Sequence, residues 1–374
     1  MAYLTSTFDA NITNRMIRPA FYSSGEKMLG WDVPVNNIDE IPKHWLSFPV
    51  VDTYLHYGIA IIYVFLMIMS LFGNGMVIWI FITTKSLRSA SNFFVVNLAI
   101  ADFIMMLKAP IFIYNSMFEG YALGKFWCQV FATMGSYSGI VQALTNLCIA
   151  YDRYRNISSP MDGQMKKLNA IIFVILTWAY ATPWTLMPLL EVWSRFVPEG
   201  YLTSCTFDYL TDTFENKLFV FFIFIFAYVI PMSLIIFFYS QIVSQVFNHE
   251  KALRAQAKKM NVESLRSGDQ AAVSAEVRIA KTAISICGLF VASWTPYAVA
   301  ALIGSFGDKE LLTPSVSMIP AICCKLVACF DPYVYAISHP KFRLELQARF
   351  SCLKINEKAP EKSDAATANA TVST

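Results

Sequence analysis

The sequence predicts an all-α membrane protein, a bundle of seven transmembrane helices followed by a short amphipathic interfacial helix. The 374 residues are 56% apolar and only 15% charged, which is too apolar for a soluble domain of this length. Seven apolar stretches are long enough to cross roughly 30 Å of hydrocarbon. The connections between these stretches are alternately rich and poor in lysine and arginine.

The seven predicted spans form one domain, residues 55–338, after an N-terminal segment, residues 1–54. The spans cover residues 55–83, 92–117, 127–151, 168–190, 217–246, 278–304 and 315–338. The second, third and seventh contain or adjoin charged residues, so their ends are less sharply defined. The sequence has no internal repeat and no matching pair of broken helices, which are typical of many transporters.

Basic residues set the expected orientation. They follow the first, third, fifth and seventh spans, as Lys85 and Arg88, then Arg153, Arg155, Lys166 and Lys167, then Lys251, Arg254, Lys258, Lys259 and Arg266, then Lys341, Arg343 and Arg349. Connections rich in lysine and arginine face the cytoplasm, so we expect the N-terminus outside. The net charge of +3 reflects this topology and does not indicate nucleic-acid binding.

The topology selects sites of covalent modification. Asn11 begins an Asn-Ile-Thr glycosylation sequon on the outer side. Cys128, at the outer end of the third span, and Cys205, in a long outer loop, are the only cysteines placed together in an oxidising compartment, which predicts a disulfide. Residues 339–353 alternate apolar residues with arginine, as interfacial helices do. Cys352, at the end of this helix, is either a palmitoylation site or a free thiol.

The remaining residues, 354–374, are small and polar and are expected to be disordered. Serines and threonines in this tail could be phosphorylated by a receptor kinase to recruit arrestin, although any disordered tail of small residues looks similar. They are Ser363, Thr367, Thr371, Ser373 and Thr374.

Ionisable residues inside a span are costly and need a partner or a function. Lys325 lies near the middle of the seventh span, where a snorkelling or carboxylate-paired lysine is one explanation. The alternative is that burial favours the neutral amine, a nucleophile that forms a Schiff base with an aldehyde. Asp102 and Lys108 are six positions apart in the second span, so they are not neighbours on one helix face and need separate explanations.

The third span ends in Asp152, Arg153 and Tyr154, which alone is weak evidence for anything beyond a basic stop at the membrane surface. A functional interpretation is that Arg153 pairs with Asp152 and with a carboxylate on another helix, such as Glu276 of the sixth span. Breaking the pair between helices would open the inner face, which makes a two-state switch.

Several motifs occur together at corresponding depths. They are Gly73 and Asn74, LAIAD ending at Asp102, Cys128 and Cys205, DRY at 152–154, Trp178, Pro231, SWTPY around Trp294 and Pro296, and DPYVY from Asp331 through Pro332 to Tyr335. In this order the set resembles the rhodopsin-like family of G-protein-coupled receptors over all seven spans. The resemblance implies that Asp331, Pro332 and Tyr335 belong to the activation switch, together with residues 152–154 and Glu276. Asp331, where many members have asparagine, and Ser293, where many have cysteine, depart from the usual pattern.

Within that family, Lys325 occupies the position at which opsins bind retinal. HPKFR at 339–343, RFVPEGYLTSCTFDYL and EKALRAQAKKMNVESLRS look like insect visual opsins, and LKAPIFIYNS, with Lys108, looks like their ultraviolet-sensitive subgroup. The resemblance implies a photoreceptor, not an enzyme, carrying retinal or 3-hydroxyretinal on Lys325 in the rhabdomeric plasma membrane. It also implies a Gq-type G protein, arrestin and a receptor kinase as partners.

The resemblance further assigns roles in the chromophore pocket. Trp294 and Tyr297 are expected to shape it. Phe131 stands where vertebrate visual opsins have their glutamate counterion, and Glu199 matches the counterion site of invertebrate opsins. A second cation, Lys108, would favour an unprotonated imine and therefore ultraviolet absorption.

Three other functions remain as alternatives. A receptor for a diffusible peptide shares the scaffold but has no use for Lys325, and an amine receptor lacks its acid in ATMGSYSG. A retinal photoisomerase would use the lysine but would not need DRY, Glu276 or a basic inner loop. An ion transporter would require a chain of acids that the spans do not contain.

Overall fold

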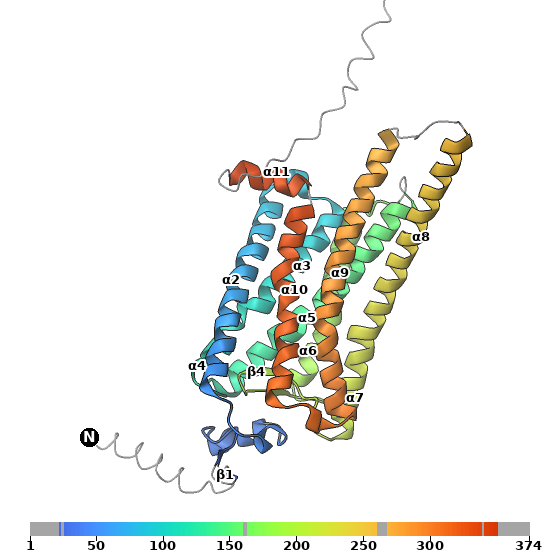
Figure 1. Ribbon diagram of the computed structural model, residues 1–374. Coiled ribbons are helices and arrows are strands. Elements are labelled where there is room, and N and C mark those ends of the chain that lie inside the picture. The colour runs from blue at the N-terminus through green and yellow to red at the C-terminus, as the bar shows by residue number, and fades with distance from the viewer. Residues whose placement is uncertain (1–21, 24–25, 160–162, 260–267, 339, 351–374) are drawn as a thin grey trace, which may run out of the picture.

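The computed structural model describes residues 22–23, 26–159, 163–259, 268–338 and 340–350, which form a bundle of long, roughly parallel helices (Figure 1). Short strands and the N-terminal segment lie at one end, here called the hairpin end. The helix α11 (Pro340–Arg349) lies across the opposite end, here called the α11 end. Asn11, Cys352 and the tail 354–374 lie outside the described residues.

The helices and strands follow one another along the chain with short connections. In order they are β1 (Tyr22–Ser23), β2 (Glu26–Lys27), the 3-10 helices η2 (Val35–Glu40) and η3 (Trp45–Ser47), α2 (Thr53–Thr83), η4 (Lys85–Leu87), α3 (Ala90–Leu107), α4 (Ala109–Met117), α5 (Gly124–Ser158), α6 (Lys167–Leu189), β3 (Phe196–Glu199), β4 (Ser204–Phe207), α7 (Phe214–Ile223), the π-helical turn η5 (Phe224–Val229), α8 (Ile230–Lys259), α9 (Gly268–Phe306), η6 (Lys309–Leu311), α10 (Pro314–Ser338) and α11.

The seven-helix prediction is confirmed, and its span limits agree with the helices to within a few residues except at the α11 end of α5, α8 and α9. Six stretches of the described chain are long and apolar enough to cross a membrane. The remaining spanning helix is α5, the third along the chain. It packs against α3, α6, α8 and α9 and against the β3–β4 hairpin. Its buried polar side chains include Gln142, Thr145 and Asn146, which lower its hydropathy and are hidden from lipid by these neighbours.

Two spans are interrupted next to a proline. In the second span α3 ends at Leu107 and α4 begins at Ala109, with Lys108 between them. Pro110 has no N–H to donate to the carbonyl four residues earlier, and its ring crowds that carbonyl. In the fifth span the π-helical turn η5 ends just before Pro231. Both interruptions change the direction in which neighbouring side chains point.

The hairpin end is covered in two layers. Strands β3 and β4 pair antiparallel, with Glu199 opposite Ser204, and all the residues of β3 are buried. The N-terminal segment forms the outer layer, in which Trp45 is fully buried. Glu40 of this segment accepts a hydrogen bond at Oε2 from Tyr121 Oη at 2.7 Å. Nothing in the sequence of the first 54 residues predicts this packing.

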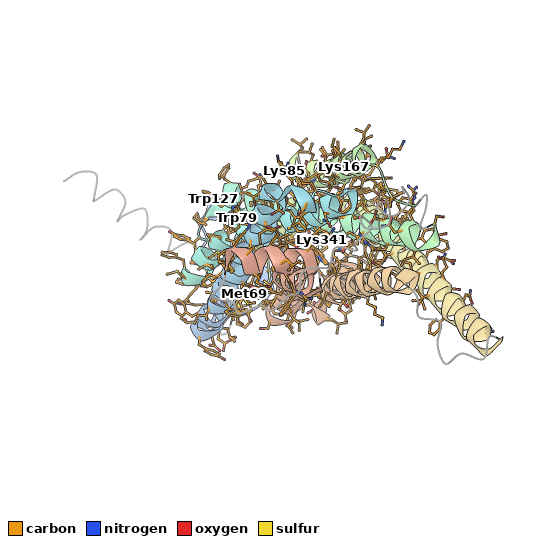
Figure 2. All side chains as sticks on the ribbon, turned by 90° about the horizontal axis from the view of Figure 1, so that it is seen from above. Met69, Trp79, Lys85, Trp127, Lys167 and Lys341 are labelled. Carbon is orange, nitrogen blue, oxygen red and sulfur yellow. A yellow bond between two sulfur atoms is a disulfide. The ribbon has the colours of Figure 1, made fainter. Side chains whose placement is uncertain are left out.

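Helix α11 confirms the core of the predicted interfacial helix. Seen along the bundle in Figure 2, it lies flat across the end of the helices. Phe342 is 1% exposed and stacks on Phe81 of α2 with ring centroids 5.7 Å apart. Arg349 covers the ring of Trp79 at 4.5 Å, so one face of α11 is held on α2 by both apolar and cation–π contacts.

Close contact between α2 and α10 explains two of the sequence motifs. A Cβ atom on Gly73 would lie 2.8 Å from Cγ of Pro332, so only glycine fits there. The amide of the next residue, Asn74, donates to the Ala328 carbonyl at 2.8 Å and to the Ser70 carbonyl at 3.0 Å. The Gly-Asn pair and the DPYVY motif are therefore two sides of one helix interface.

The Gly73→Ala variant is expected to unfold at a lower temperature than the unmodified protein. Overlap with a rigid proline ring costs about 1–3 kcal/mol, more than the gain of up to ~1 kcal/mol from alanine's helix propensity. Thermal unfolding in detergent measures this difference. The control is Gly58→Ala in the same helix, where a Cβ meets nothing within 4 Å, so its Tm should be unchanged or higher. Equal Tm values for the two variants would contradict the packing argument.

Candidate chromophore site

A large apolar cavity lies inside the hairpin end of the bundle. It encloses about 1030 Å³, including space that is open to solvent, and its lining is mostly apolar. Its walls come from spans two, three, five, six and seven and from the β3–β4 hairpin. Among the described lining residues three are charged, namely Lys108, Glu199 and Lys325.

The side chain of Lys325, on α10, lines this cavity. It is 5% exposed, and its Nζ donates to Sγ of Cys324 at 3.3 Å. The hydroxyl of Tyr63, on α2, interacts with the same amine. The amine is therefore held inside protein and does not reach the membrane surface, which excludes the snorkelling interpretation of Lys325.

Lys108 reaches the same cavity from the break in the second span. It is 4% exposed, and its Nζ lies 4.1 Å from the ring centroid of Phe131 on α5. A Cβ on Gly135 would overlap this Nζ, so the missing side chain leaves room for the lysine. Lys108 and Phe131, which the sequence analysis treated as separate clues, thus form one cation–π contact in the cavity wall. Asp102, by contrast, lies deeper and accepts from Gln142 Nε2 at 2.6 Å.

Glu199 ends strand β3 and faces the cavity from the hairpin. It is 2% exposed, so it is not a solvated loop carboxylate. Oε2 accepts a hydrogen bond from the Tyr297 hydroxyl at 3.2 Å, and the same hydroxyl is hydrogen-bonded to Thr206. Burial raises the pKa of Glu199 from its ordinary value of 4.5 to about 7, against the opposing effects of Lys325, the Tyr297 hydrogen bond and Lys108.

Trp294 forms part of the cavity wall, one turn from Tyr297 on α9. It stacks on Phe290 with centroids 5.8 Å apart and meets Tyr297 edge-on at 6.2 Å. A Cβ on Gly139 of α5 would lie 2.8 Å from Cζ2 of Trp294, so the indole packs directly on the α5 backbone. The α5 backbone therefore blocks any displacement of the indole toward α5.

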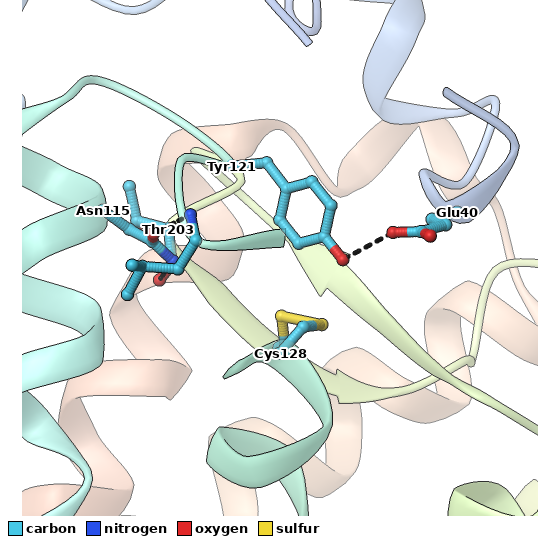
Figure 3. Close-up of a disulfide and its surroundings, with 7 residues drawn as sticks. Glu40, Asn115, Tyr121, Cys128 and Thr203 are labelled. Carbon is cyan, nitrogen blue, oxygen red and sulfur yellow. Dashed lines mark hydrogen bonds between the residues drawn. A yellow bond between two sulfur atoms is a disulfide. The ribbon is translucent and has the colours of Figure 1, made fainter. Parts of the chain in front are cut away.

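The β3–β4 hairpin is held over the cavity by the predicted disulfide. Cys128, at the start of α5, is bonded to Cys205 of β4, with Cα atoms 5.3 Å apart. Figure 3 shows this bond below Tyr121 and its hydrogen bond to Glu40. In the same view the Asn115 side chain donates to the Thr203 carbonyl at 3.2 Å, which ties the hairpin turn to α4.

At the α11 end the predicted switch residues are only partly described. Arg153 Nη2 lies 2.8 Å from Oδ2 of Asp152. Tyr154, the third residue of the motif, packs its ring near Phe238 of α8, with centroids 5.4 Å apart. The side chain of Glu276 is outside the described residues, so its pairing with Arg153 stays a prediction.

The predicted switch residues of α10 lie further from the membrane surface. Asp331 is 3% exposed and shares a small cavity with Asp102 and Asn74. Pro332 packs on Gly73. The side chain of Tyr335 lies outside the described part of the chain.

Sequence reasoning missed two residues that line the cavity and one that contacts the amine of Lys325. Gly135 and Gly139 are four apart in ATMGSYSG, which puts two small residues on one helix face, and this spacing could have indicated a close approach to α5. Tyr63 had no such signal, because an aromatic residue in an apolar span is usually part of the packing.

Comparison with known proteins agrees with this geometry. The family described as "7 transmembrane receptor (rhodopsin family)" matches residues 73–335. The chain is 59% identical over 349 residues to the ultraviolet-sensitive opsin of Apis mellifera, covering 93% of this chain and 94% of the relative. It is 58% identical to opsin Rh4 of Drosophila melanogaster, covering 95% of both chains. The crystal structure of squid rhodopsin superimposes with a TM-score of 0.78 at 33% identity, covering 86% of this chain and 92% of the squid protein.

The raised pKa of Glu199 predicts how the stability of the protein without a ligand depends on pH. A carboxyl whose pKa is 4.5 when unfolded and about 7 when folded binds more protons in the folded state, so stability falls as pH rises through this interval. The fall amounts to about 3 kcal/mol, as an order of magnitude. Thermal unfolding between pH 5 and 8 should show this slope, and Glu199→Gln, which cannot ionise, should flatten it. Parallel slopes would contradict the assignment.

Proposed function

Since this chain belongs to the rhodopsin family of seven-transmembrane receptors, and within it is a photoreceptor opsin rather than an enzyme, we propose that it carries retinal covalently on Lys325. We further propose that it absorbs ultraviolet light and activates a Gq-type G protein. The observation that carries the proposal is an amine in the middle of an apolar helix, buried, and opening into a large apolar cavity. The experiment is a test for a covalent adduct and for light-dependent signalling.

The residues of the cavity fit retinal. A polyene aldehyde needs an apolar volume of this size and one nucleophile, and the cavity provides both. Aromatic side chains of spans five and six, including Phe224, Tyr228 and Trp294, line the wall contributed by those spans, while the two lysines belong to spans two and seven. Apart from the phenols of Tyr228 and Tyr297 this wall is apolar, which supports retinal and leaves 3-hydroxyretinal as a variant.

The charges of the cavity support ultraviolet absorption. A protonated imine at Lys325 would need a nearby anion, and Glu199 supplies the candidate counterion from the hairpin. Its pKa of about 7 leaves it about half protonated at neutral pH, and Lys108 adds a second amine to the same cavity. Both conditions favour an unprotonated imine, in which retinal lacks the charge delocalisation that moves its absorption into the visible.

The packing around Trp294 supports a route to the G protein. Light changes the shape of bound retinal, and this change acts on the cavity wall. The indole is stopped by α5 at Gly139, so the strain goes into α9, which contains Pro296 two residues further on. Movement of α9 at the α11 end, away from Arg153, would open a cleft between α9 and α5 for a Gq-type protein.

The remaining partners follow from this function. Arrestin and a receptor kinase would act on the tail, the N-terminus would face outward with Asn11 glycosylated, and the protein would lie in the rhabdomeric plasma membrane. A retinal photoisomerase remains as an alternative that uses the same cavity. Light-dependent nucleotide exchange on a Gq-type protein distinguishes the two, because a photoisomerase would give none.

Lys325→Arg is expected to abolish pigment formation, because a guanidinium does not condense with an aldehyde to give this adduct. After incubation with 11-cis-retinal, borohydride treatment should leave radiolabel or added mass on the peptide that contains residue 325 in the unmodified protein only. Light-dependent nucleotide exchange should disappear in the same variant. A bleachable pigment from Lys325→Arg would overturn the proposed attachment.

Lys108→Glu is expected to move the absorption of the dark pigment from the ultraviolet to the visible. The substitution removes one cation and places an anion beside the imine, and Lys108→Leu, which only removes the cation, should give a smaller shift or a mixture. Absorption spectra before and after acidification measure the fraction of protonated imine. If both variants keep the ultraviolet peak of the unmodified protein, Lys108 does not determine the absorption.

A further inference from the structure

Tyr63, on α2, has a position that the proposed function does not explain. It is 1% exposed, and its ring stacks on Phe112 of α4 with centroids 3.7 Å apart and planes 13° apart. The stack fixes the direction of the phenol, so that its hydroxyl points from the first span toward α10. The ring alone accounts for the packing, and an apolar side chain would pack as well. The hydroxyl of Tyr63 therefore needs a separate explanation.

The hydroxyl lies where the side chain of Lys325 leaves its helix. It donates to the carbonyl of Ala321 at 3.5 Å, a long bond, and it also interacts with the Lys325 amine. Side chains on a helix lean toward the preceding turn, so a lysine four residues after Ala321 passes over that carbonyl. Geometry and helix direction therefore both place the phenol beside the nucleophile.

Attaching an aldehyde to a lysine requires two proton transfers. The nitrogen lone pair bonds to the aldehyde carbon, and the carbon–oxygen electrons move to the oxygen. Both N–H protons must then leave the nitrogen, and the oxygen must gain two protons to depart as water. In an apolar cavity water cannot readily carry these protons, so a side chain that both accepts and donates a proton is needed.

Among the described residues that line the cavity or touch the amine, several others could exchange protons. The hydroxyl of Tyr297 is hydrogen-bonded to Glu199 and Thr206, and that of Tyr228 to Thr295. Glu199 accepts from Tyr297, on the hairpin side, and Lys108 lies over the Phe131 ring. None of these groups is hydrogen-bonded to the Lys325 amine in the described contacts. Cys324 is hydrogen-bonded to the amine, but its Sγ already donates to the Ala321 carbonyl at 3.3 Å, and a thiol is a weak hydrogen-bond donor.

We propose that Tyr63 is a catalytic residue for attachment and release of the chromophore, relaying protons between Lys325 Nζ and the aldehyde oxygen. This inference rests on the proposed covalent bond at Lys325. In each transfer the phenol oxygen accepts one proton from nitrogen and gives its own proton to oxygen, so Tyr63 ends neutral. After two transfers the products are one water molecule and an imine without a proton, the form proposed for ultraviolet absorption.

The test compares the rate of attachment with its extent. Tyr63→Phe keeps the ring that stacks on Phe112 and removes only the hydroxyl. Mixed with excess 11-cis-retinal, this variant should form the borohydride-trapped adduct about 100-fold more slowly than the unmodified protein, within the range typical of general acid–base catalysis. The final amount of adduct should be the same, and displacement by hydroxylamine should be slower by a similar factor.

The control is Tyr333→Phe. Tyr333, on α10, also donates its hydroxyl to a carbonyl of α2, that of Met69 at 3.2 Å, but Lys325 is not among its described contacts. This variant should attach retinal at the rate of the unmodified protein. Retinol, which has no aldehyde, should quench tryptophan fluorescence equally in all three proteins, which shows that Tyr63→Phe still binds the polyene.

A second variant keeps the proposal testable if Tyr63→Phe folds poorly. Difluorotyrosine introduced at residue 63 has nearly the same size and a more acidic phenol, so the pH dependence of the attachment rate should move to lower pH. An unmoved profile, or an unchanged rate in a folded Tyr63→Phe protein, overturns the relay while leaving attachment at Lys325 intact. If the unmodified protein forms no trapped adduct, the proposed function itself has failed.

Discussion

Two lysine amines face one cavity in which the described lining residues supply a single carboxylate, Glu199. Two like charges that face one buried cavity repel each other, so the arrangement is strained whenever both amines are protonated. Converting one amine into an imine without a proton relieves the strain and leaves Lys108 to share Glu199. The proposed absorption and the proposed proton relay of Tyr63 both follow from this imbalance.

Three separate features of the fold place the three charged side chains in the cavity wall. A proline-induced break turns Lys108 inward from the second span, the disulfide holds the hairpin that carries Glu199, and an uninterrupted stretch of α10 carries Lys325. Small residues on α5 make room for both Lys108 and Trp294. The same helix therefore contacts the groups that set the charge state and the indole proposed to pass on the change of shape, which couples the two at short range.

Much of this could be predicted from the sequence, because the relevant patterns lie within single segments of the chain. Length and hydropathy define the spans, Cys128 and Cys205 are the cysteines available for a bridge, and Gly73 and Asn74 belong to a recurrent motif. Other features depend on contacts between distant segments. Glu199 has the sequence context of a loop, and only the two layers above the cavity make it buried. The position of Tyr63 depends on a ring stack with Phe112, 49 positions away, which no pattern within one helix reveals.

The polar character of α5 affects how the chain enters the membrane. A segment that is apolar enough is transferred to lipid by its own hydrophobicity, whereas α5 falls below the level that the six other spans reach. Its integration during synthesis must therefore rely on helices that already shield Gln142, Thr145 and Asn146, above all α3. Substitutions that weaken the α3–α5 contact would then be expected to act first in biogenesis, by leaving the third helix outside the bilayer before any pigment is assembled.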